Sequence, residues 1–415
     1  MNANEHLKAA AQRARAAAHV LARSSRTVRD SALRAMADAL RDAMRDILTA
    51  NAADVAAYHG TASFLDRLVL TEARVEAMAC GLEAVAALPD PLNRVLDDWT
   101  QPNGLRFQRI ATPIGVIGMI YESRPNVAAD AAALCLKSGN AVILRGGSDS
   151  TLSAAAIALA LRRGLAAAGL PEGGVQIAPN ADRAYVAAML AGADLLDLII
   201  PRGGASLVER VRREARVAVL AHAQGLNHTY VHAAADPAMA RAIIANAKMR
   251  RTGVCGATET LLIDRLVADS LLPLLTDDLR ALGCTFRADA AARAVVPWLP
   301  AAADGDFDTE WLDAVLSVAV VDGVDSALAH IAAHGSEHTD AIVTEDAAVA
   351  DYFLRGVDSA VALWNASTQF CDGAEFGFGA EIGISTGRIH ARGPVGLEQL
   401  TTYRTIVFGA GQVRS

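Results

Sequence analysis

The stretch GVIGMIYESRPNVAADAAALCLKSGNAVILRGGSDS, residues 115–150, contains the pattern that decides the fold. Two apolar, β-rich runs at 115–122 and 141–147 enclose an alanine-rich helical stretch at 126–138. Because both runs are apolar at successive positions, we expect strands covered on both faces, as in a parallel sheet. The alternation continues with strands expected at 196–204 and 216–223 and helices at 150–168, 182–192 and 204–214. The stretch therefore predicts an α/β fold.

The remaining chain extends this pattern on both sides. Residues 1–90 have apolar residues at three- and four-residue spacing, which predicts helices only. After a candidate boundary at 225–237, a second α/β series is expected, with helices at 237–249, 266–282 and 324–334 and strands at 258–264, 316–322, 340–346 and 359–368. The isolated β-like pieces 104–113 and 400–409 suggest strands that pair outside the main sheets in an oligomerisation flap.

Composition excludes several classes of function. The chain has 415 residues, 53% of them apolar, and a formal net charge of −8. At roughly 100–200 residues per domain we expect two or three domains, and the negative charge argues against nucleic acid or an anionic membrane surface as partner. We expect neither a secretory signal nor a membrane span. The five cysteines are far apart, which fits a reducing cytoplasm and neither disulfides nor a zinc site.

Cys255 lies in RRTGVCGATE, residues 250–259, with a glycine two positions before it and another directly after it. Most cytosolic cysteines are small buried hydrophobic residues, and that is the ordinary alternative. Bare backbone lets a ligand approach closely, and Lys248, Arg250 and Arg251 would lower the pKa of a nearby thiol. We therefore predict that Cys255 is a nucleophile.

Two glycine pairs follow predicted strands: Arg145, Gly146, Gly147 and Ser148 in one turn, and Pro201, Arg202, Gly203 and Gly204 in the other. Neither matches the dinucleotide fingerprint G-x-G-x-x-G, and each alone is an ordinary strand-to-helix turn. Two such turns at strand carboxyl ends, both with arginine, favour a phosphate-bearing cofactor at helix N-termini. Arg145 is the residue that we expect to pair with the 2′-phosphate of NADP.

Two further stretches are rich in histidine and arginine. His330, His334 and His338 recur at four-residue spacing, but Gly335 interrupts the helix that would align them, so we expect no metal site and assign them no role. The segment from Arg388 to Arg392 is either a solvated loop or a cationic wall for an anionic substrate.

Taken together, these stretches resemble the gamma-glutamyl phosphate reductases, a branch of the aldehyde dehydrogenase superfamily. The resemblance spans nearly the whole chain and is carried by residues 122–150, 199–207, 246–262, 327–344, 365–370 and 379–403. The histidine-rich and C-terminal stretches are specific to this branch, whereas the cysteine loop and LKSGNAVILR belong to the wider superfamily.

The resemblance implies an aldehyde dehydrogenase-like fold in three parts. These are a cofactor-binding domain at 1–230, with 105–123 contributing to an oligomerisation arm, a catalytic domain at 231–370, and a return segment with a C-terminal oligomerisation strand at 371–415. It also implies a homo-oligomer that binds NADPH without the usual fingerprint. By motif position Cys255 is the nucleophile, Arg145 lies beside the adenosine ribose, and 201–204 starts the helix under the cofactor's phosphates.

Two departures from the wider superfamily bear on the chemistry. Hydrolytic members carry a glutamate base a little over thirty residues before the cysteine, but the matching stretch VAVLAHAQGLNHTY, residues 217–230, has none, and the nearest are Glu214 and Glu259. A thioester at Cys255 therefore lacks the usual base for activating water, and phosphate is its expected exchange partner. The asparagine turn of the superfamily reads YESRPN here, so Asn126 and the backbone N–H of Cys255 are the expected oxyanion donors.

The reaction implied is the NADPH-dependent reduction of L-glutamyl 5-phosphate to L-glutamate 5-semialdehyde, the second step of proline synthesis from glutamate. Arg124, Arg388 and Arg392 are candidates for binding the substrate's anionic groups, and association with a glutamate 5-kinase is a further expectation. One alternative is an NAD-dependent semialdehyde dehydrogenase that makes a carboxylate, against which the missing glutamate weighs. The other is an inactive cofactor-binding scaffold, against which the Cys255 loop and both glycine turns weigh.

Overall fold

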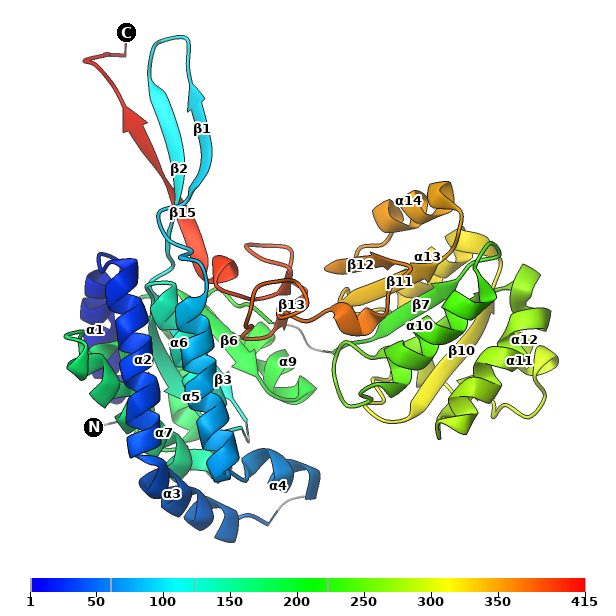
Figure 1. Ribbon diagram of the computed structural model, residues 1–415, viewed down its shortest axis with the longest axis horizontal. Helices are drawn as coiled ribbons and strands as arrows, with labels where there is room; N and C mark the ends of the chain where they lie inside the picture. Colours follow the sequence, from blue (N-terminus) through cyan, green and yellow to red (C-terminus); the bar gives the residue numbers. More distant parts are fainter. Residues whose placement is uncertain (1, 60–61, 123, 222–223, 415) are drawn as a thin grey trace. The chain divides into compact units, whose positions relative to one another are not determined.

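In the computed structural model, which describes residues 2–59, 62–122, 124–221 and 224–414, the strands form four sheets (Figure 1). The chain divides into two units. Unit 1 comprises Met1–Ala221, Phe378–Gly383 and Val395–Ser415, and unit 2 comprises His222–Gly377 and Ile384–Pro394. The division after residue 221 precedes the expected boundary at 230, and both units take part of the expected return segment, 371–415.

Unit 1 contains a four-stranded parallel sheet in the order β5-β4-β3-β6. Its strands are β3 (Val116–Tyr121), β4 (Ala141–Arg145), β5 (Val175–Ile177) and β6 (Leu198–Arg202). Every residue of β3 and β4 is buried, as their continuous apolar runs predict. The strand expected at 216–223 is wrong: among its described residues only Val219 forms a bridge, with Ile199 at the edge of the sheet.

The helices of unit 1 confirm the helical prediction for the first ninety residues. They are α1 (Ala3–Leu21), α2 (Arg26–Asp42), α3 (Met44–Ala56), α4 (Ala62–Leu68), α5 (Glu72–Ala87), α6 (Val127–Lys137), α7 (Thr151–Ala167), α8 (Arg183–Ala191) and α9 (Ala205–Glu214). Helices α2 and α7 approach so closely that a Cβ on Gly164 would lie 2.4 Å from the Cα of Met36. No helix in the described ranges is both long and apolar enough to cross a membrane.

A separate antiparallel sheet has the order β1-β2-β15. Its strands are β1 (Val95–Thr100), β2 (Arg106–Pro113) and β15 (Thr401–Phe408), which confirms that the two isolated β-like pieces pair outside the main sheets. The expected arm portion, 105–123, is too long, because β3 belongs to the parallel sheet. Strand β1 was not predicted, since two consecutive aspartates, Asp97 and Asp98, break its apolar pattern.

Unit 2 contains a six-stranded parallel sheet in the order β12-β11-β7-β8-β10-β9. Its strands are β7 (Asn227–Val231), β8 (Thr258–Asp264), β9 (Thr285–Ala288), β10 (Val315–Val321), β11 (Thr339–Val343) and β12 (Val361–Trp364). Its helices are α10 (Pro237–Met249), α11 (Arg265–Ala281), α12 (Ala290–Val295), α13 (Gly323–His334) and α14 (Ala347–Gly356). Strand β7 lies within 225–237, the candidate domain boundary, and β9 was not predicted. The short pair β13 (Ile384–Ser385) and β14 (Gly393–Pro394) also belongs to this unit.

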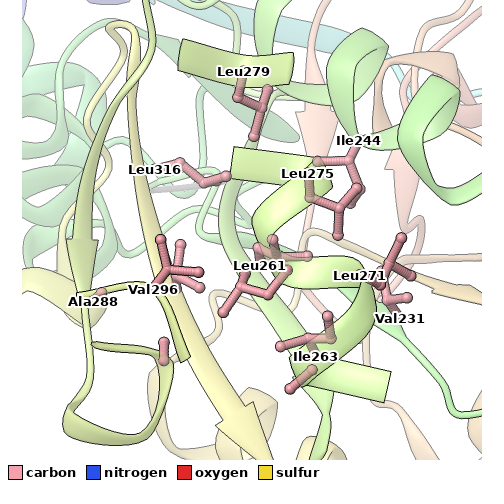
Figure 2. Close-up of a cluster of buried hydrophobic side chains, with 14 of the residues drawn as sticks. Val231, Ile244, Leu261, Ile263, Leu271, Leu275, Leu279, Ala288, Val296 and Leu316 are labelled. Carbon is pink, nitrogen blue, oxygen red and sulfur yellow. The ribbon is translucent and has the colours of Figure 1, made fainter. Parts of the chain in front are cut away.

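The two faces of the six-stranded sheet bury alternate residues. On one face Leu261 and Ile263 of β8 join a cluster with residues of α10 and α11, including Ile244 and Leu275 (Figure 2). On the other face Leu262 joins a second cluster with residues of α13 and α14. This two-sided burial explains why the strands are apolar throughout and confirms the α/β prediction for this half of the chain.

Candidate active site

The helix before the thiol loop ends against Gln369, which lies in the short 3₁₀ turn Thr368–Phe370. The side-chain nitrogen of Gln369 donates to the carbonyl oxygens of Asn246 (3.2 Å), Ala247 (3.0 Å) and Arg251 (3.2 Å). Carbonyl groups at a helix C-terminus have no intrahelical partner, so this amide caps α10 and fixes the start of the loop.

Asn227 and Gly225 hold the backbone of the thiol itself. The Asn227 side-chain nitrogen donates to the carbonyls of Cys255 (2.6 Å) and Ala257 (2.9 Å), and its side-chain oxygen accepts from the N–H of Thr339 (3.2 Å). A Cβ on Gly225 would lie 2.1 Å from the Cys255 carbonyl oxygen, so only glycine fits there. The backbone of the loop is therefore held by residues that precede Cys255 by about thirty positions.

Cys255 differs from the other cysteines in its exposure. It is half-buried and packs against a small cluster of Val361, Cys371 and Ile384. By contrast, burial raises the pKa of Cys284 to about 11 and raises the pKa of the Cys135 thiol even further. Of the thiols in unit 2, Cys255 is thus the one that is partly exposed and held in a loop.

The charge around the loop differs from the sequence expectation. The Lys248 ammonium is fully buried and lies 2.6 Å from the carboxylate of Glu259, so its charge is paired. Burial raises the pKa of Glu259 to about 7, against the opposing effect of Lys248. Arg250 donates to the side-chain oxygen of Gln369. Lys248 therefore anchors the loop and is not an unpaired cation beside the thiol.

A carboxylate missed by the sequence reasoning lies near the loop. Glu310 is half-buried and accepts from the N–H of Gly225 at 2.9 Å, and Gly225 in turn packs on Cys255. Burial raises the pKa of Glu310. The absence of a glutamate upstream of Cys255 therefore does not mean that no carboxylate lies near it. Glu310 reaches this region from fifty-five residues later in the chain.

Two histidines of the histidine-rich stretch lie in an aromatic cluster with edge-on and tilted ring contacts. The ring of His330 lies edge-on to His228 (5.5 Å between centroids) and Phe307 (5.1 Å), and His334 lies 4.6 Å away. Helix α13 ends at His334, so Gly335 does interrupt the row, and His338 lies beyond it, before β11. No group of three or more metal-ligating side chains is found in the described part of the chain.

The arginines of the segment 388–392 face carboxylates. Arg388 and Arg392 each contact both Glu337 and Asp358, with the contacts between Arg392 and these carboxylates at 3.2–3.3 Å. The cationic wall that the sequence suggested is thus a mixed cluster of two guanidinium groups and two carboxylates, partly exposed. Glu337 has a positive φ of 58°, an uncommon conformation for a residue other than glycine.

Unit 1 contains a cavity of about 870 Å³. It is lined by the segments after β3 and β4 and by residues of α8 and α9. Arg145, Gly147, Ser148 and Gly204 line it, whereas Gly146, Pro201, Arg202 and Gly203 lie in the adjoining strand ends and turns. Ligands of parallel α/β sheets bind at the carboxyl ends of the strands, and this cavity lies at that edge of the sheet.

The start of α9 already binds an anion. The Glu122 carboxylate accepts from the N–H of Gly204 at 2.9 Å, and a Cβ on Gly203 would lie 2.4 Å from the same carboxylate oxygen. A helix N-terminus carries a partial positive charge and unsatisfied N–H groups. The Glu122 carboxylate thus shows that the start of α9 accommodates an anionic group.

Asn126 and Arg124 lie between β3 and α6. Asn126 is the N-terminal cap residue of α6, and its side-chain nitrogen donates to Asp130 at 3.0 Å. Burial raises the pKa of Asp130 to about 6. Arg124 is half-buried beside residue 123, which lies outside the described residues. Their roles in binding and catalysis stay predictions.

Comparison with known proteins agrees with this geometry. The aldehyde dehydrogenase family profile matches residues 1–294. The gamma-glutamyl phosphate reductase of Acidiphilium cryptum is 67% identical over 98% of this chain and 97% of its own length. The crystal structure of the gamma-glutamyl phosphate reductase from Thermotoga maritima is 41% identical, with a TM-score of 0.97 over 99% of this chain and 100% of that one.

The chain belongs to the gamma-glutamyl phosphate reductases, within the aldehyde dehydrogenase family. An engineered glycolyl-CoA reductase with bound NADP⁺ shares the fold at 17% identity, with a TM-score of 0.66 over 97% of this chain and 96% of that one. The recognition made on the sequence motifs is therefore confirmed, as is the aldehyde dehydrogenase-like fold.

Besides Glu310, sequence reasoning missed Asn227 and Gln369, whose side chains hold the thiol loop. Gln369 lies in NASTQF, one of the motifs that carry the resemblance, so that motif was a usable signal. Asn227 lies within 225–237, which the sequence suggests is a domain boundary. Its contacts reach 112 residues along the chain, and no local pattern predicts them.

Proposed function

We propose that the protein reduces L-glutamyl 5-phosphate to L-glutamate 5-semialdehyde with release of phosphate, through a thioester at Cys255. The observation that carries the proposal is the thiol of Cys255, half-buried in a loop that Asn227 and Gly225 hold in one position, in a chain of this family. This is the second step in making proline from glutamate.

The chemistry at the sulfur has three stages. The Cys255 thiolate attacks the acyl-phosphate carbonyl, a C–S bond forms, and the C–O bond to phosphate breaks. A nicotinamide cofactor, held by residues 145–148 and 201–204, would supply the hydride that reduces this thioester. The resulting hemithioacetal oxyanion collapses, the C–S bond breaks, and the thiolate leaves the aldehyde product.

NADPH is the cofactor that we propose for the cavity of unit 1. Three observations support this proposal: the size of the cavity, its position at the carboxyl ends of the strands, and the hydrogen bond from the N–H of Gly204 to the carboxylate of Glu122. The glycolyl-CoA reductase of the same fold carries NADP⁺. Residues 145–148 and 201–204 would hold the cofactor's adenosine and phosphates.

Asn126 is the side chain that we propose as oxyanion donor, together with the backbone N–H of Cys255. The Asn126 amide donates one hydrogen to the Asp130 carboxylate, and no described residue accepts its second hydrogen. One preorganised donor contributes about 3–4 kcal/mol, so Asn126→Ala should lower the rate at least a hundredfold. A loss of less than about threefold would remove Asn126 from the site.

Arg124, Arg388 and Arg392 are proposed to bind the anionic groups of the substrate. Arg388 and Arg392 lie in a cluster with Glu337 and Asp358 that has no net charge. Such a cluster complements a substrate headgroup that carries both an ammonium and a carboxylate. In this role the guanidinium groups would give up a contact with a protein carboxylate and form one with the carboxylate of the substrate.

Assembly and location follow the same reasoning. We propose a homo-oligomer formed through the β1-β2-β15 sheet, on which Tyr403, Val407 and Phe408 are exposed. None of the five cysteines forms a disulfide, which fits the reducing cytoplasm. Association with a glutamate 5-kinase stays part of the proposal.

The reverse reaction tests the proposed function. Protein, L-glutamate 5-semialdehyde and NADP⁺ are mixed with and without phosphate, and nicotinamide absorbance is followed. We expect repeated turnover to require phosphate, with at most one NADP⁺ reduced per chain in its absence, and almost no reduction in Cys255→Ser, which should still bind NADPH. Repeated phosphate-independent reduction would identify a hydrolytic enzyme, for which Glu310 is the candidate base, and no reduction with either cofactor would identify an inactive scaffold.

A further inference from the structure

Three arginine side chains from three segments meet at the cavity of unit 1. They are Arg145 at the end of β4, Arg183 at the first position of α8 and Arg210 on α9. Burial lowers the pKa of Arg145; the negative charge of Glu122 opposes this shift, and the positive charges of Arg183 and Arg210 add to it. Like charges gathered at one cavity repel one another, and a bound anion would relieve that repulsion.

Arg145 is committed to the protein. Its two terminal nitrogens donate to the carbonyls of Gly146 (2.9 Å) and Ala181 (2.6 Å), and only 9% of its surface is exposed. Ala181 precedes Arg183 by two residues. Arg145 thus ties the end of β4 to the segment that carries Arg183, and it offers little surface to a ligand.

Arg183 and Arg210 are the more available cations. Arg183 is exposed, and no hydrogen bond or ion pair to another described residue holds it. Arg210 uses one nitrogen on Glu214 (2.9 Å), which leaves its other two without a partner in the described part of the chain. Ser206 and Leu207, one turn earlier on α9, line the cavity with Arg210, so this helix face points toward it.

The carboxylates that line the cavity are engaged elsewhere. Asp54 accepts from the N–H groups of Leu152 and Ser153, and Glu122 accepts from the N–H of Gly204. Asp149 also has a partner within the protein. The hydrogen bonds of Asp54 and Glu122 thus come from backbone N–H groups and the Ser153 hydroxyl, and not from Arg183 or Arg210.

Arg210 also lies away from the phosphate position at the start of α9. It is six residues beyond Gly204, which corresponds to about 9 Å along the helix axis. A diphosphate bound at the helix start would leave Arg210 for a second, separate anionic group. NADP differs from NAD by one such group, the phosphate on the adenosine ribose.

We propose that Arg183 and Arg210 bind the 2′-phosphate of NADP(H) and thereby determine the preference for it over NAD(H), with Arg145 positioning the segment that carries Arg183. This replaces the direct role that the sequence suggested for Arg145. The inference rests on the proposed function, because it concerns the cofactor of that reaction.

Calorimetric titration with 2′,5′-ADP and 5′-AMP isolates this group, since the two nucleotides differ only by the 2′-phosphate. In Arg183→Ala and in Arg210→Ala, affinity for 2′,5′-ADP should fall roughly 10- to 100-fold, the effect of losing a charge-assisted hydrogen bond. Affinity for 5′-AMP should change by less than about fivefold. Arg212→Ala, exposed on the same helix and outside the cavity lining, is the matched control and should change neither.

A double variant tests the positioning role of Arg145. If Arg145 acts through Arg183, Arg145→Ala should lower the ratio of the affinity for 2′,5′-ADP to that for 5′-AMP when it is introduced into the wild type. Introduced into Arg183→Ala, it should lower this ratio no further. Additive losses would show that Arg145 contacts the phosphate itself and would overturn this part of the proposal.

Equal losses for both nucleotides, or a wild type that does not distinguish them, would overturn the specificity assignment. If phosphate-dependent reduction persists in that case with NAD⁺, the proposed function stands and only the assignment fails. If neither NADP⁺ nor NAD⁺ is reduced, the proposed function itself is wrong.

Discussion

The side-chain nitrogen of Asn227 donates to the carbonyl oxygen of Cys255 at 2.6 Å and to that of Ala257 at 2.9 Å. Asn227→Asp removes both donors and places a carboxylate against two carbonyl oxygens. Each buried carbonyl left without a donor costs about 1–3 kcal/mol, so unfolding should require at least about 2 kcal/mol less. The rate of Cys255 alkylation by iodoacetamide should also change, because the loop is no longer held.

Asn365→Asp provides the matched control. Asn365 pairs in the same way with the backbone of Thr344, donating to its carbonyl (3.0 Å) and accepting from its N–H (2.9 Å). It should lose stability while Cys255 is alkylated at the wild-type rate. Equal changes of the alkylation rate in both variants would contradict a specific role for Asn227.

Gly225 is predicted to tolerate no side chain. A Cβ there would lie 2.1 Å from the Cys255 carbonyl oxygen, so Gly225→Ala must displace the loop, and we expect activity to fall at least about a hundredfold, as for other misplaced reacting groups. Gly81→Ala, in helix α5 with nothing within 4 Å, should instead stabilise the protein by about 1 kcal/mol. Wild-type kcat in Gly225→Ala would show that the contact is not needed.

The parallel sheets could be predicted from the sequence, but the thiol loop's supports could not. Continuous apolar runs such as β3 and β4 are readable because both faces are buried. Strand β7 begins with Asn227, His228 and Thr229, which are all fully buried. In the sequence these polar residues suggest a domain boundary and not a buried strand. Their burial is offset by hydrogen bonds to partners far along the chain, such as Asp340 for His228, and these are not encoded locally.

The same limit explains the charged residues. Arg388 and Arg392 look like a cationic patch in sequence because Glu337 and Asp358 are at least thirty residues away. Lys248 also looks like a free cation in sequence, because its pairing with Glu259, eleven residues along the chain, depends on the fold and not on local spacing. Residue types locate such groups, but only the fold shows which of them neutralise one another.

The buried pair of Lys248 and Glu259 should be strongly asymmetric to mutation. Glu259→Gln leaves a fully buried ammonium without a counter-ion and should destabilise the protein by about 3–5 kcal/mol. Replacing both residues by methionine removes both charges, so the double variant should be more stable than either single one. Denaturant unfolding at pH 8 measures all of these, and additive losses in the double variant would contradict a coupled pair.

Acid stability should depend on His330. Burial among Phe307, His228 and His334 lowers its pKa from 6.5 to about 3. The unfolded chain therefore takes up the proton first, so this group's contribution is present above pH 6.5 and is lost as the pH falls toward 3. The slope is at most about 1.4 kcal/mol per pH unit, reduced by the partial exposure of the ring.

His330→Phe removes this titration. Its unfolding free energy, measured between pH 7 and pH 4.5, should fall less steeply than that of the wild type. Parallel curves for the two proteins would show that His330 is not held in its neutral form.

The covalent state of Cys255 tests the central claim most directly. Protein mixed with L-glutamate 5-semialdehyde and NADP⁺ in the absence of phosphate should accumulate one glutamyl group per chain, because its exchange partner is missing. Peptide mass spectrometry should locate that group as a thioester on Cys255, and adding phosphate should remove it. A glutamyl group on another residue, or reduction of NADP⁺ with the Cys255 thiol unmodified, would contradict the account.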